Sequence, residues 1–442
     1  MYAFLKDIVI GQKNRYLVII GVLSILFCFD FTLLIILTNI SLINDSLFEL
    51  IGQIIILITM IVSFILMMFI NNFFVDQKSD EFSIILLSGR NVVWVSKYIT
   101  VQFGSLFILA ALFGSSLSVL FVKGISSIFS MFKILELFSI HSISTIFYYY
   151  ISLLLVKICF IFIVDLGKFM DIKFRIVEYM NHIQKHKTKV SFFSSFIVEK
   201  EKKSIPIWQI VVVLLSLIII VTSIQHIIVI NDFVSLLVYF TSSLIALIFF
   251  VKYFIPLFFD FFHNKWLIEH PMILMAINQL IYLLKAMTPL ILINTILTPF
   301  MFFLISMPII NIYLLGVVII CYLILLFMIA ICFVFRFSVY IPVKTRDIAT
   351  LKAIGYSKKE IDFIHGLEII LFVFFAVVLP FLIYITVVSK AYILDFISIK
   401  LIISLISCYF IIYLFIGLYM IIGYKRLTRE VIKNVKYLNR SE

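Results

Sequence analysis

The sequence predicts an all-α polytopic membrane protein with about ten transmembrane helices and with both termini in the cytoplasm. Hydrophobic residues make up 64% of the 442 positions and charged residues only 13%. A soluble domain of this length keeps roughly a quarter of its residues charged. The chain also contains apolar runs of twenty or more residues, such as Tyr16 to Asn39 and Leu401 to Gly423. Lipid must therefore surround most of the chain.

These runs indicate helices rather than barrel strands. Barrel strands alternate apolar and polar residues over about ten positions, whereas a spanning helix needs about 20 mainly apolar residues. The predicted spans are 16–39, 48–75, 98–122, 143–166, 207–230, 233–258, 282–305, 309–336, 363–389 and 399–424.

The positions of Lys and Arg fix the predicted orientation. With the amino terminus inside, thirty of the 35 basic residues fall in cytoplasmic segments and four in outer segments. Cytoplasmic segments of membrane proteins carry an excess of Lys and Arg. Because the basic residues lie between spans, the net charge of +12 predicts a membrane topology and no nucleic-acid partner.

The longest polar segment, residues 167–205, is predicted to be cytoplasmic. Apolar residues recur in it at helical spacing from Phe169 to Ile183, with Lys and Arg between them. This pattern predicts a basic amphipathic helix on the inner leaflet, and a solvated linker is the alternative. Residues 1–15 are predicted to form an elbow helix, and residues 425–442 a basic cytoplasmic tail.

A short cytoplasmic pattern occurs twice, 266 residues apart. Each copy has a lysine, an acid three residues later, an aliphatic residue four residues after the acid, and a glycine four residues after that. The copies are Lys78, Glu81, Ile85 and Gly89, and Lys344, Asp347, Leu351 and Gly355. An acid at a helix start interacts favourably with the positive end of the helix dipole. Glycine can adopt the left-handed conformation that ends a helix. The pattern therefore predicts two short helices.

On each predicted helix, residues three and four positions apart lie on one face, which can contact another surface. Phe82, Ile85 and Leu86 share that face in one copy, and Ile348, Leu351 and Lys352 share it in the other. We interpret the two faces as docking surfaces for another protein. The alternative is that each helix lies against lipid.

The sequence Arg346-Asp-Ile-Ala-Thr-Leu-Lys-Ala-Ile-Gly-Tyr-Ser-Lys-Lys-Glu-Ile361 resembles the signature of FtsX-like (MacB-type) permeases of ABC transporters. The first copy, ending Ser88-Gly89-Arg90-Asn91, is a weaker match. The resemblance covers two four-helix units, residues 1–166 and 271–424, joined by two linking helices within 206–270. This layout is similar to that of the ten-helix permeases of bacitracin and lantibiotic resistance.

The resemblance implies a permease driven by two copies of a separate ATP-binding subunit, which would hold ATP and Mg²⁺. It implies the bacterial inner membrane as location and an amphiphilic substrate, such as an antimicrobial peptide, a bacteriocin or a lipid-linked molecule. The residues implied in ATPase coupling are Lys78, Glu81, Phe82, Ile85, Gly89, Lys344, Arg346, Asp347, Leu351, Lys352 and Gly355.

The sequence departs from those resistance permeases in one respect. They carry a large extracellular domain between the seventh and eighth helices, whereas only Ser-Met-Pro separates Ile305 from Ile309 here. Sensor-kinase signalling, which is associated with that domain, is therefore not implied.

No motif for catalysis occurs in the chain. A G-x-x-x-x-G-K-[ST] loop is missing, so we expect no ATP hydrolysis by a P-loop mechanism and no enzyme activity in this chain. The five cysteines lie in apolar segments without metal or disulfide spacing, which predicts small buried hydrophobes and no metal site.

Charge within a membrane span is costly, and three charged residues within the predicted spans are singled out for this reason. Asp30 lies near the middle of the first span, and Lys157 lies in the fourth. We hypothesise that they face each other or a polar groove; separate snorkelling or a polar neighbour is the alternative. Glu368 is interpreted as an acid that favours the start of the ninth helix.

Two other functions are compatible with the sequence. A non-transporting scaffold could use the same fold to convey ATPase motion to a partner protein, and ATPase stimulation by peptide or lipid in nanodiscs would favour transport over it. An ion-coupled transporter would need acids at a midplane site, for which Asp30 is the candidate.

Overall fold

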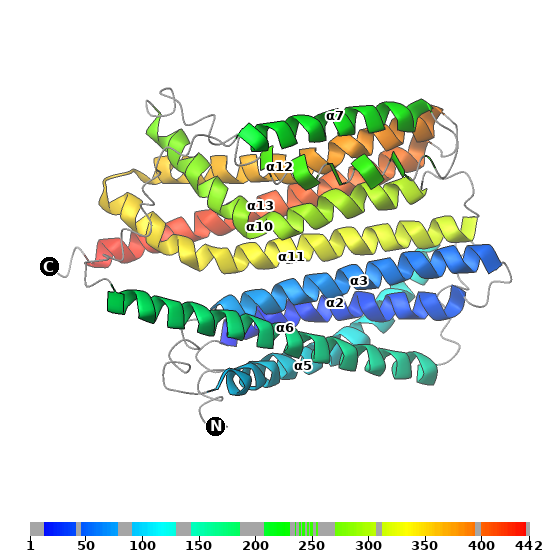
Figure 1. Ribbon diagram of the computed structural model, residues 1–442, viewed down its shortest axis with the longest axis horizontal. Helices are drawn as coiled ribbons and strands as arrows, with labels where there is room; N and C mark the ends of the chain where they lie inside the picture. Colours follow the sequence, from blue (N-terminus) through cyan, green and yellow to red (C-terminus); the bar gives the residue numbers. More distant parts are fainter. Residues whose placement is uncertain are drawn as a thin grey trace. The chain divides into compact units, whose positions relative to one another are not determined.

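The computed structural model describes residues 13–40, 46–77, 91–129, 143–185, 207–229, 270–305, 312–393 and 399–438, with scattered residues between 235 and 254. Every regular element within these residues is a helix, and no strand occurs among them (Figure 1). This agrees with the predicted all-α class.

Helices coincide with the predicted spans wherever the structure describes them, except that the span predicted at 233–258 lies largely outside the described residues. The helices are α2 (Lys13–Ile40), α3 (Ser46–Gln77), α5 (Val92–Phe129), α6 (Ile143–Lys185), α7 (Ile207–Val229), α10 (Pro271–Ile305), α11 (Ile312–Ala353), α12 (Lys358–Ile393) and α13 (Ile399–Leu438).

Six of these helices are long and apolar enough to cross a membrane, which makes the chain a multi-pass membrane protein. Their apolar segments are Tyr16–Thr38, Ile51–Asn72, Val93–Gly124, Ile146–Gly167, Leu314–Ser338 and Ile403–Val431.

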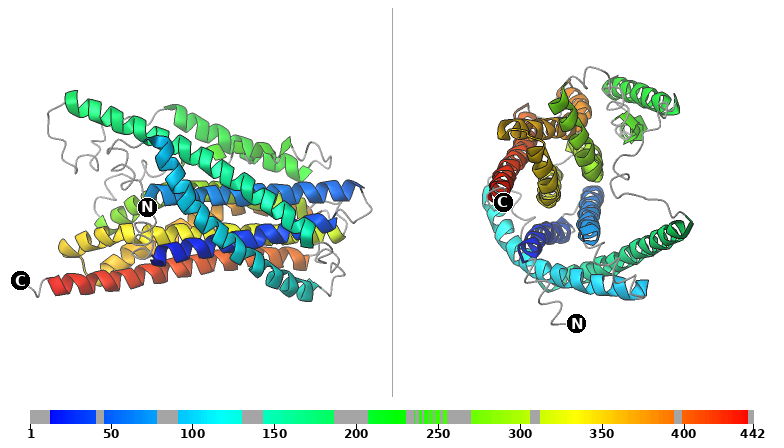
Figure 2. Two further views of the ribbon diagram at one scale, coloured as in Figure 1. Left: turned by 90° about the horizontal axis from the view of Figure 1, so that it is seen from below. Right: turned by 90° about the vertical axis from the view of Figure 1, so that its left-hand side faces the viewer.

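The chain divides into two compact units. The first contains α2, α3, α5 and α6, and the second contains α7, α10, α12, α13 and most of α11. In the first unit α2 packs against α3, α5 and α6, and α5 crosses it obliquely (Figure 2). Edge-to-face ring contacts join Phe27 of α2 to Phe107 of α5 and Phe31 to Tyr150 of α6. Such contacts stabilise apolar packing without any polar group.

A glycine allows the close approach of α2 and α5. A Cβ atom at Gly114 would lie 2.6 Å from the Cβ of Phe27 and 2.6 Å from the carbonyl oxygen of Ser24. Small residues let membrane helices approach closely, which is where their packing energy arises. Gly114 therefore sets the distance between these two helices.

In the second unit α12 packs against α7, α10 and α13. The Asn294 side chain of α10 donates a hydrogen bond to the carbonyl of Ala376 at 3.1 Å. The Tyr409 hydroxyl of α13 donates to the carbonyl of Val377 at 3.3 Å. Phe333 of α11 contacts rings on both α12 and α13.

Several helices continue past the predicted span ends. α6 runs through residue 166 to Lys185, so the expected break between a span and a cytoplasmic segment does not occur there. Residues 1–12 of the predicted elbow helix and residues 186–205 of the predicted cytoplasmic segment lie outside the described residues, and residues 13–15 belong to α2.

Helix starts repeat at the spacing of the cytoplasmic pattern. The same 266 residues separate Ser46 from Ile312, which start α3 and α11, and Val92 from Lys358, which start α5 and α12. The internal repeat therefore extends from the short pattern to the helices on both sides of it.

A substitution at Gly114 should destabilise the first unit. Gly114→Ala forces α2 and α5 apart, and overpacking of this kind costs about 1–3 kcal/mol. Gly104→Ala on the same helix meets no atom within 4 Å and is the control. Thermal unfolding in detergent should show a lower midpoint for Gly114→Ala only. Equal midpoints would show that the close approach contributes nothing.

Candidate functional site

The second copy of the repeated pattern forms the end of α11 and not a separate helix. α11 runs unbroken from Ile312 to Ala353, so Asp347 lies inside it and the predicted helix start at this acid is wrong. Pro342 lies within this helix, where it removes one backbone hydrogen bond and disfavours a straight helix. Because the apolar segment ends at Ser338, the helix extends about 22 Å beyond it.

Gly355 ends α11, as the pattern predicts. Its φ of 108° lies in the left-handed region that favours glycine. The amide of Gly355 donates to the carbonyl of Lys352 at 3.1 Å, and the amide of Tyr356 donates to the carbonyl of Leu351 at 3.1 Å. These two bonds form a Schellman motif, which satisfies carbonyls that the helix end would leave unpaired.

A capping box starts α12 two residues later. The backbone amide of Ser357 donates to the Glu360 carboxylate at 2.7 Å, and the amide of Glu360 donates to the Ser357 hydroxyl at 3.4 Å. The spacing Ser-x-x-Glu is a sequence signal for such a helix start, and our sequence analysis missed it. The hydrogen bond from the Ser357 amide, aided by its hydroxyl, lowers the pKa of Glu360.

Residues 350–359 therefore form a defined turn between two long helices, which we call the α11–α12 tip. Apolar residues within the turn and on either side of it pack inside the protein. Ile348 and Leu351 are buried in a cluster to which α10, α12 and α13 all contribute. The cluster consists of Ala276, Ile348, Leu351, Ile361, Ile364 and Val431.

This burial corrects the predicted docking face. Ile348 and Leu351 cannot contact another protein, because their side chains are covered by the chain itself. Helical spacing showed correctly that they share a face, but spacing alone does not tell whether that face meets a partner or the protein's own core.

Different residues of the α11–α12 tip are accessible. Ile354 is 67% exposed, and Thr350, Lys358 and Lys359 are exposed with it. Lys352 is half-buried and donates to the Tyr356 carbonyl at 3.4 Å. The side chain of Arg346 lies outside the described part of the structure. The tip thus presents one large apolar side chain beside two cations.

A buried polar network lies beneath the α11–α12 tip. Lys344 Nζ of α11 lies 3.5 Å from Glu368 Oε1 of α12, and both side chains are buried. His365 Nδ1 lies 3.1 Å from Glu368 Oε2, and the Tyr424 hydroxyl of α13 donates to the same carboxylate at 3.4 Å. Lys344 also lies 3.7 Å from Asp347. Three helices are thereby joined through one carboxylate.

The position of Glu368 corrects a second prediction. Glu368 was interpreted as a helix-start acid, but α12 begins ten residues earlier at Lys358. Glu368 is instead fully buried and compensates the charge of Lys344. A buried charge without such a partner would be strongly unfavourable.

The first copy of the pattern lies outside the described residues. It comprises the predicted coupling residues Lys78, Glu81, Phe82, Ile85 and Gly89. The helix after this copy, α5, begins at Val92, and the carbonyl of Asn91 just before it accepts from the amides of Trp94 and Val95 at 3.0 and 3.2 Å. Asn91 and Ser357 are separated by the same 266 residues, and both are favoured N-cap residues.

The structure brings together the two charged residues of the first unit. Lys157 Nζ lies 2.6 Å from Asp30 Oδ2, with side-chain exposures of 4% and 0%. The lysine also lies 3.6 Å from the sulfur of Met67 and 5.8 Å from the centre of the Phe27 ring. The pair links α2 to α6 in the interior of the unit, where it satisfies two otherwise costly charges.

A further polar contact was not anticipated. Asn71 Nδ2 of α3 donates to Asp165 Oδ1 of α6 at 2.7 Å, and Thr100 of α5 donates to Oδ2 at 3.5 Å. Asp165 is fully buried. An acid within the predicted span 143–166 was the available signal, but Asp165 was not singled out from the sequence.

Removing one member of the Asp30–Lys157 pair should destabilise the first unit. Asp30→Asn or Lys157→Met leaves one buried charge without its partner, at a cost of about 3–5 kcal/mol. The double variant should lose less than the sum of the single losses, measured by thermal unfolding. Lys97→Met, an exposed lysine of the same unit, is the control. Additive losses would contradict the pairing.

The capping box should make stability depend on pH. The pKa of Glu360 is lower in the folded chain, so its contribution is present above the usual carboxyl pKa and is lost as the pH falls through the lowered value. Glu360→Gln keeps a hydrogen-bonding group but does not titrate. Its melting temperature should fall less between pH 7 and pH 4 than that of the wild type or of Asp362→Asn. Equal falls in all three proteins would contradict this role.

Comparison with known proteins does not assign the chain to a family. No family model matches it, and no curated protein matches it. Within the described residues, no group of three His, Cys, Asp or Glu side chains could hold a metal ion. The geometry of the α11–α12 tip and of the buried network beneath it therefore carries the functional argument.

Proposed function

We propose that the chain is the membrane permease subunit of an ATP-driven ABC transporter of the FtsX-like, mechanotransmission type, driven by a separate ATP-binding subunit. The observation that carries the proposal is the α11–α12 tip, in which a helix extending well past its apolar segment is capped and returned directly into a second long helix. Such a tip can act as a lever, because an ATP-binding subunit bound to it could move both helices together.

Force applied to this lever would reach the apolar segments through the buried contacts that join α11 to α12. Leu351 is buried beneath the turn, and Lys344 is tied to Glu368 across α11 and α12. Close-packed interiors transmit strain because they compress little. A push on the tip would therefore move α11 and α12 as a pair.

The exposed chemistry of the tip favours a particular partner surface. Ile354 is a large accessible apolar side chain, with Lys358 and Lys359 following it. The matching surface is an apolar groove with an acidic rim, because interfaces combine an apolar anchor with charge complementarity. Two copies of the pattern, at Glu81–Gly89 and Asp347–Gly355, suit two ATP-binding subunits per permease.

The proposed substrate is amphiphilic, such as an antimicrobial peptide, a bacteriocin or a lipid-linked molecule, moved for export or resistance at the bacterial inner membrane. Only six residues connect the end of α10 at Ile305 to the start of α11 at Ile312. This connection has no room for a large extracellular domain. A transporter without such a domain would take its substrate from the bilayer, where amphiphilic molecules partition.

Substitution at the tip should abolish binding of the ATP-binding subunit without unfolding the protein. The full chain is purified from its native membranes with any bound subunit, and Mg²⁺-dependent ATP hydrolysis of the complex is measured. Ile354→Asp, or Lys358→Glu with Lys359→Glu, should lower the co-purified ATPase activity roughly tenfold or more. Arg429→Glu, an exposed charge reversal on α13, is the control.

Leu351→Asp provides a second comparison, because it buries a charge in the cluster and should lower the unfolding temperature itself. Tip variants that fold normally and still retain full ATPase activity would contradict the proposal. A chain that never brings an ATPase with it would contradict it as well.

A further inference from the structure

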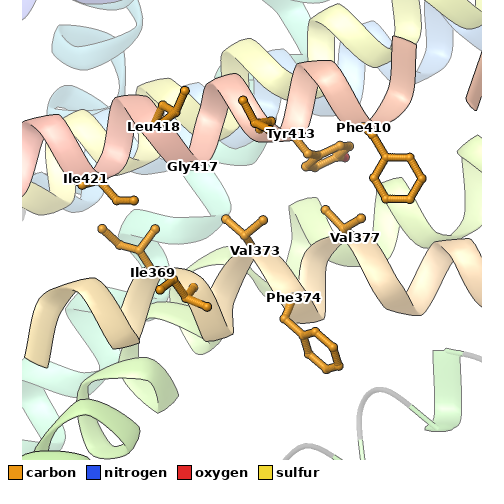
Figure 3. A pocket seen from close by; sticks show the side chains of 11 residues that line it. Ile369, Val373, Phe374, Val377, Phe410, Tyr413, Gly417, Leu418 and Ile421 are labelled. Atoms are coloured by element: carbon orange, nitrogen blue, oxygen red, sulfur yellow. The ribbon is translucent and has the colours of Figure 1, made fainter. Parts of the chain in front are cut away.

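An apolar groove runs along the second unit between α12 and α13. This open groove has a volume of about 460 Å³, within the range of roughly 300–1,000 Å³ typical of ligand sites. Figure 3 shows Val373 and Val377 of α12 facing Tyr413 of α13 across it. Gly417 lets α12 and α13 approach closely at the floor, since a Cβ there would lie 3.3 Å from Cγ2 of Val373. Ile370 and Leu418 at its rim are exposed.

The groove continues into a polar compartment at one end. Ile369, Ile370 and Ile421 line both parts. The polar part is bordered by Asp362, His365 and Lys425. A site that is apolar along its length and charged at one end has the shape and polarity of a phospholipid.

His365 adds an unsatisfied group to the polar end. Its ring stacks on Tyr424 with centroids 4.5 Å apart, and its Nδ1 lies 3.1 Å from Glu368. Its Nε2 is buried without a hydrogen-bond partner in the described structure. Buried polar atoms are normally paired, so an unpaired one indicates a ligand or solvent that completes the site.

We propose that this groove binds a phospholipid with a hydroxylated headgroup, such as phosphatidylglycerol. One acyl chain lies along Val373, Leu414 and Leu418, and the phosphate meets Lys425. A headgroup hydroxyl meets Asp362 and His365. A hydroxyl suits this pair because it donates to a carboxylate and can either donate to or accept from an imidazole nitrogen.

The charges near the polar end fit this orientation. The apolar segment Ile403–Val431 includes Lys425 close to its end, and Arg426 and Arg429 are exposed beside it. Basic residues at the end of a membrane segment mark the headgroup region and attract anionic lipids. The inference does not depend on ATP-driven transport, because it concerns the isolated chain.

Native mass spectrometry of the delipidated full chain in neutral detergent tests the proposal. With phosphatidylglycerol, phosphatidylethanolamine and phosphatidylcholine added at equal concentration, the wild type should retain one phosphatidylglycerol in preference. Leu418→Trp should fill the groove, and Lys425→Gln should remove the phosphate contact. Each should lower the bound fraction about fivefold or more.

Two variants control for nonspecific lipid adhesion. Ile422→Trp adds the same ring at another exposed position of α13, and Lys400→Gln removes an exposed charge at the other end of α13; neither residue lines the groove. Both should bind as the wild type does. Equal binding by all variants, or no preference among lipids, would overturn the proposal. So would a preference for phosphatidylethanolamine, or a dimer of the chain that Leu418→Trp dissociates.

Discussion

The structure depends on how charge is accommodated in a chain that is almost two-thirds hydrophobic. A lysine that leaves water is stable only beside a carboxylate with which it can pair. The first unit meets this requirement with Lys157 and Asp30, and the second with Lys344 and Glu368. The first pair joins α2 to α6, which are distant in sequence, and so restricts which helices can be neighbours. The second pair joins the consecutive helices α11 and α12 and so restricts how they lie against each other. Apolar packing, which is not directional, could not impose that restriction alone.

In the second unit this constraint has a mechanical consequence. The Lys344–Glu368 pair lies beneath a turn that is closed by a left-handed glycine and a reciprocal cap. The turn is further supported by the cluster around Leu351. A turn fixed in these three ways moves together with the helices it joins, and our functional proposal rests on this property.

Much of the helical architecture could be predicted from the sequence, because apolar length and glycine position are local signals. Gly355 ends its helix as expected, and Asp30 lies beside Lys157. The role of Asp347 could not be predicted, because nothing local shows that a helix from a span will continue past it. The burial of Ile348 and Leu351 likewise depends on α10 and α13, which are distant in sequence. Glu368 was misassigned because its partner lies on another helix. The Ser357–Glu360 cap, by contrast, could have been predicted from its Ser-x-x-Glu spacing, but it was not.

The central claim is that the buried Lys344–Glu368 pair holds α11 and α12 together beneath the tip. Amide hydrogen exchange of the full chain, compared between the wild type and Glu368→Gln, tests it most directly. We expect slow exchange from Lys344 to Ala353 in the wild type, and faster exchange there in the variant, while α2 remains unchanged. Fast exchange of this segment in the wild type, or identical rates in both proteins, would contradict the claim.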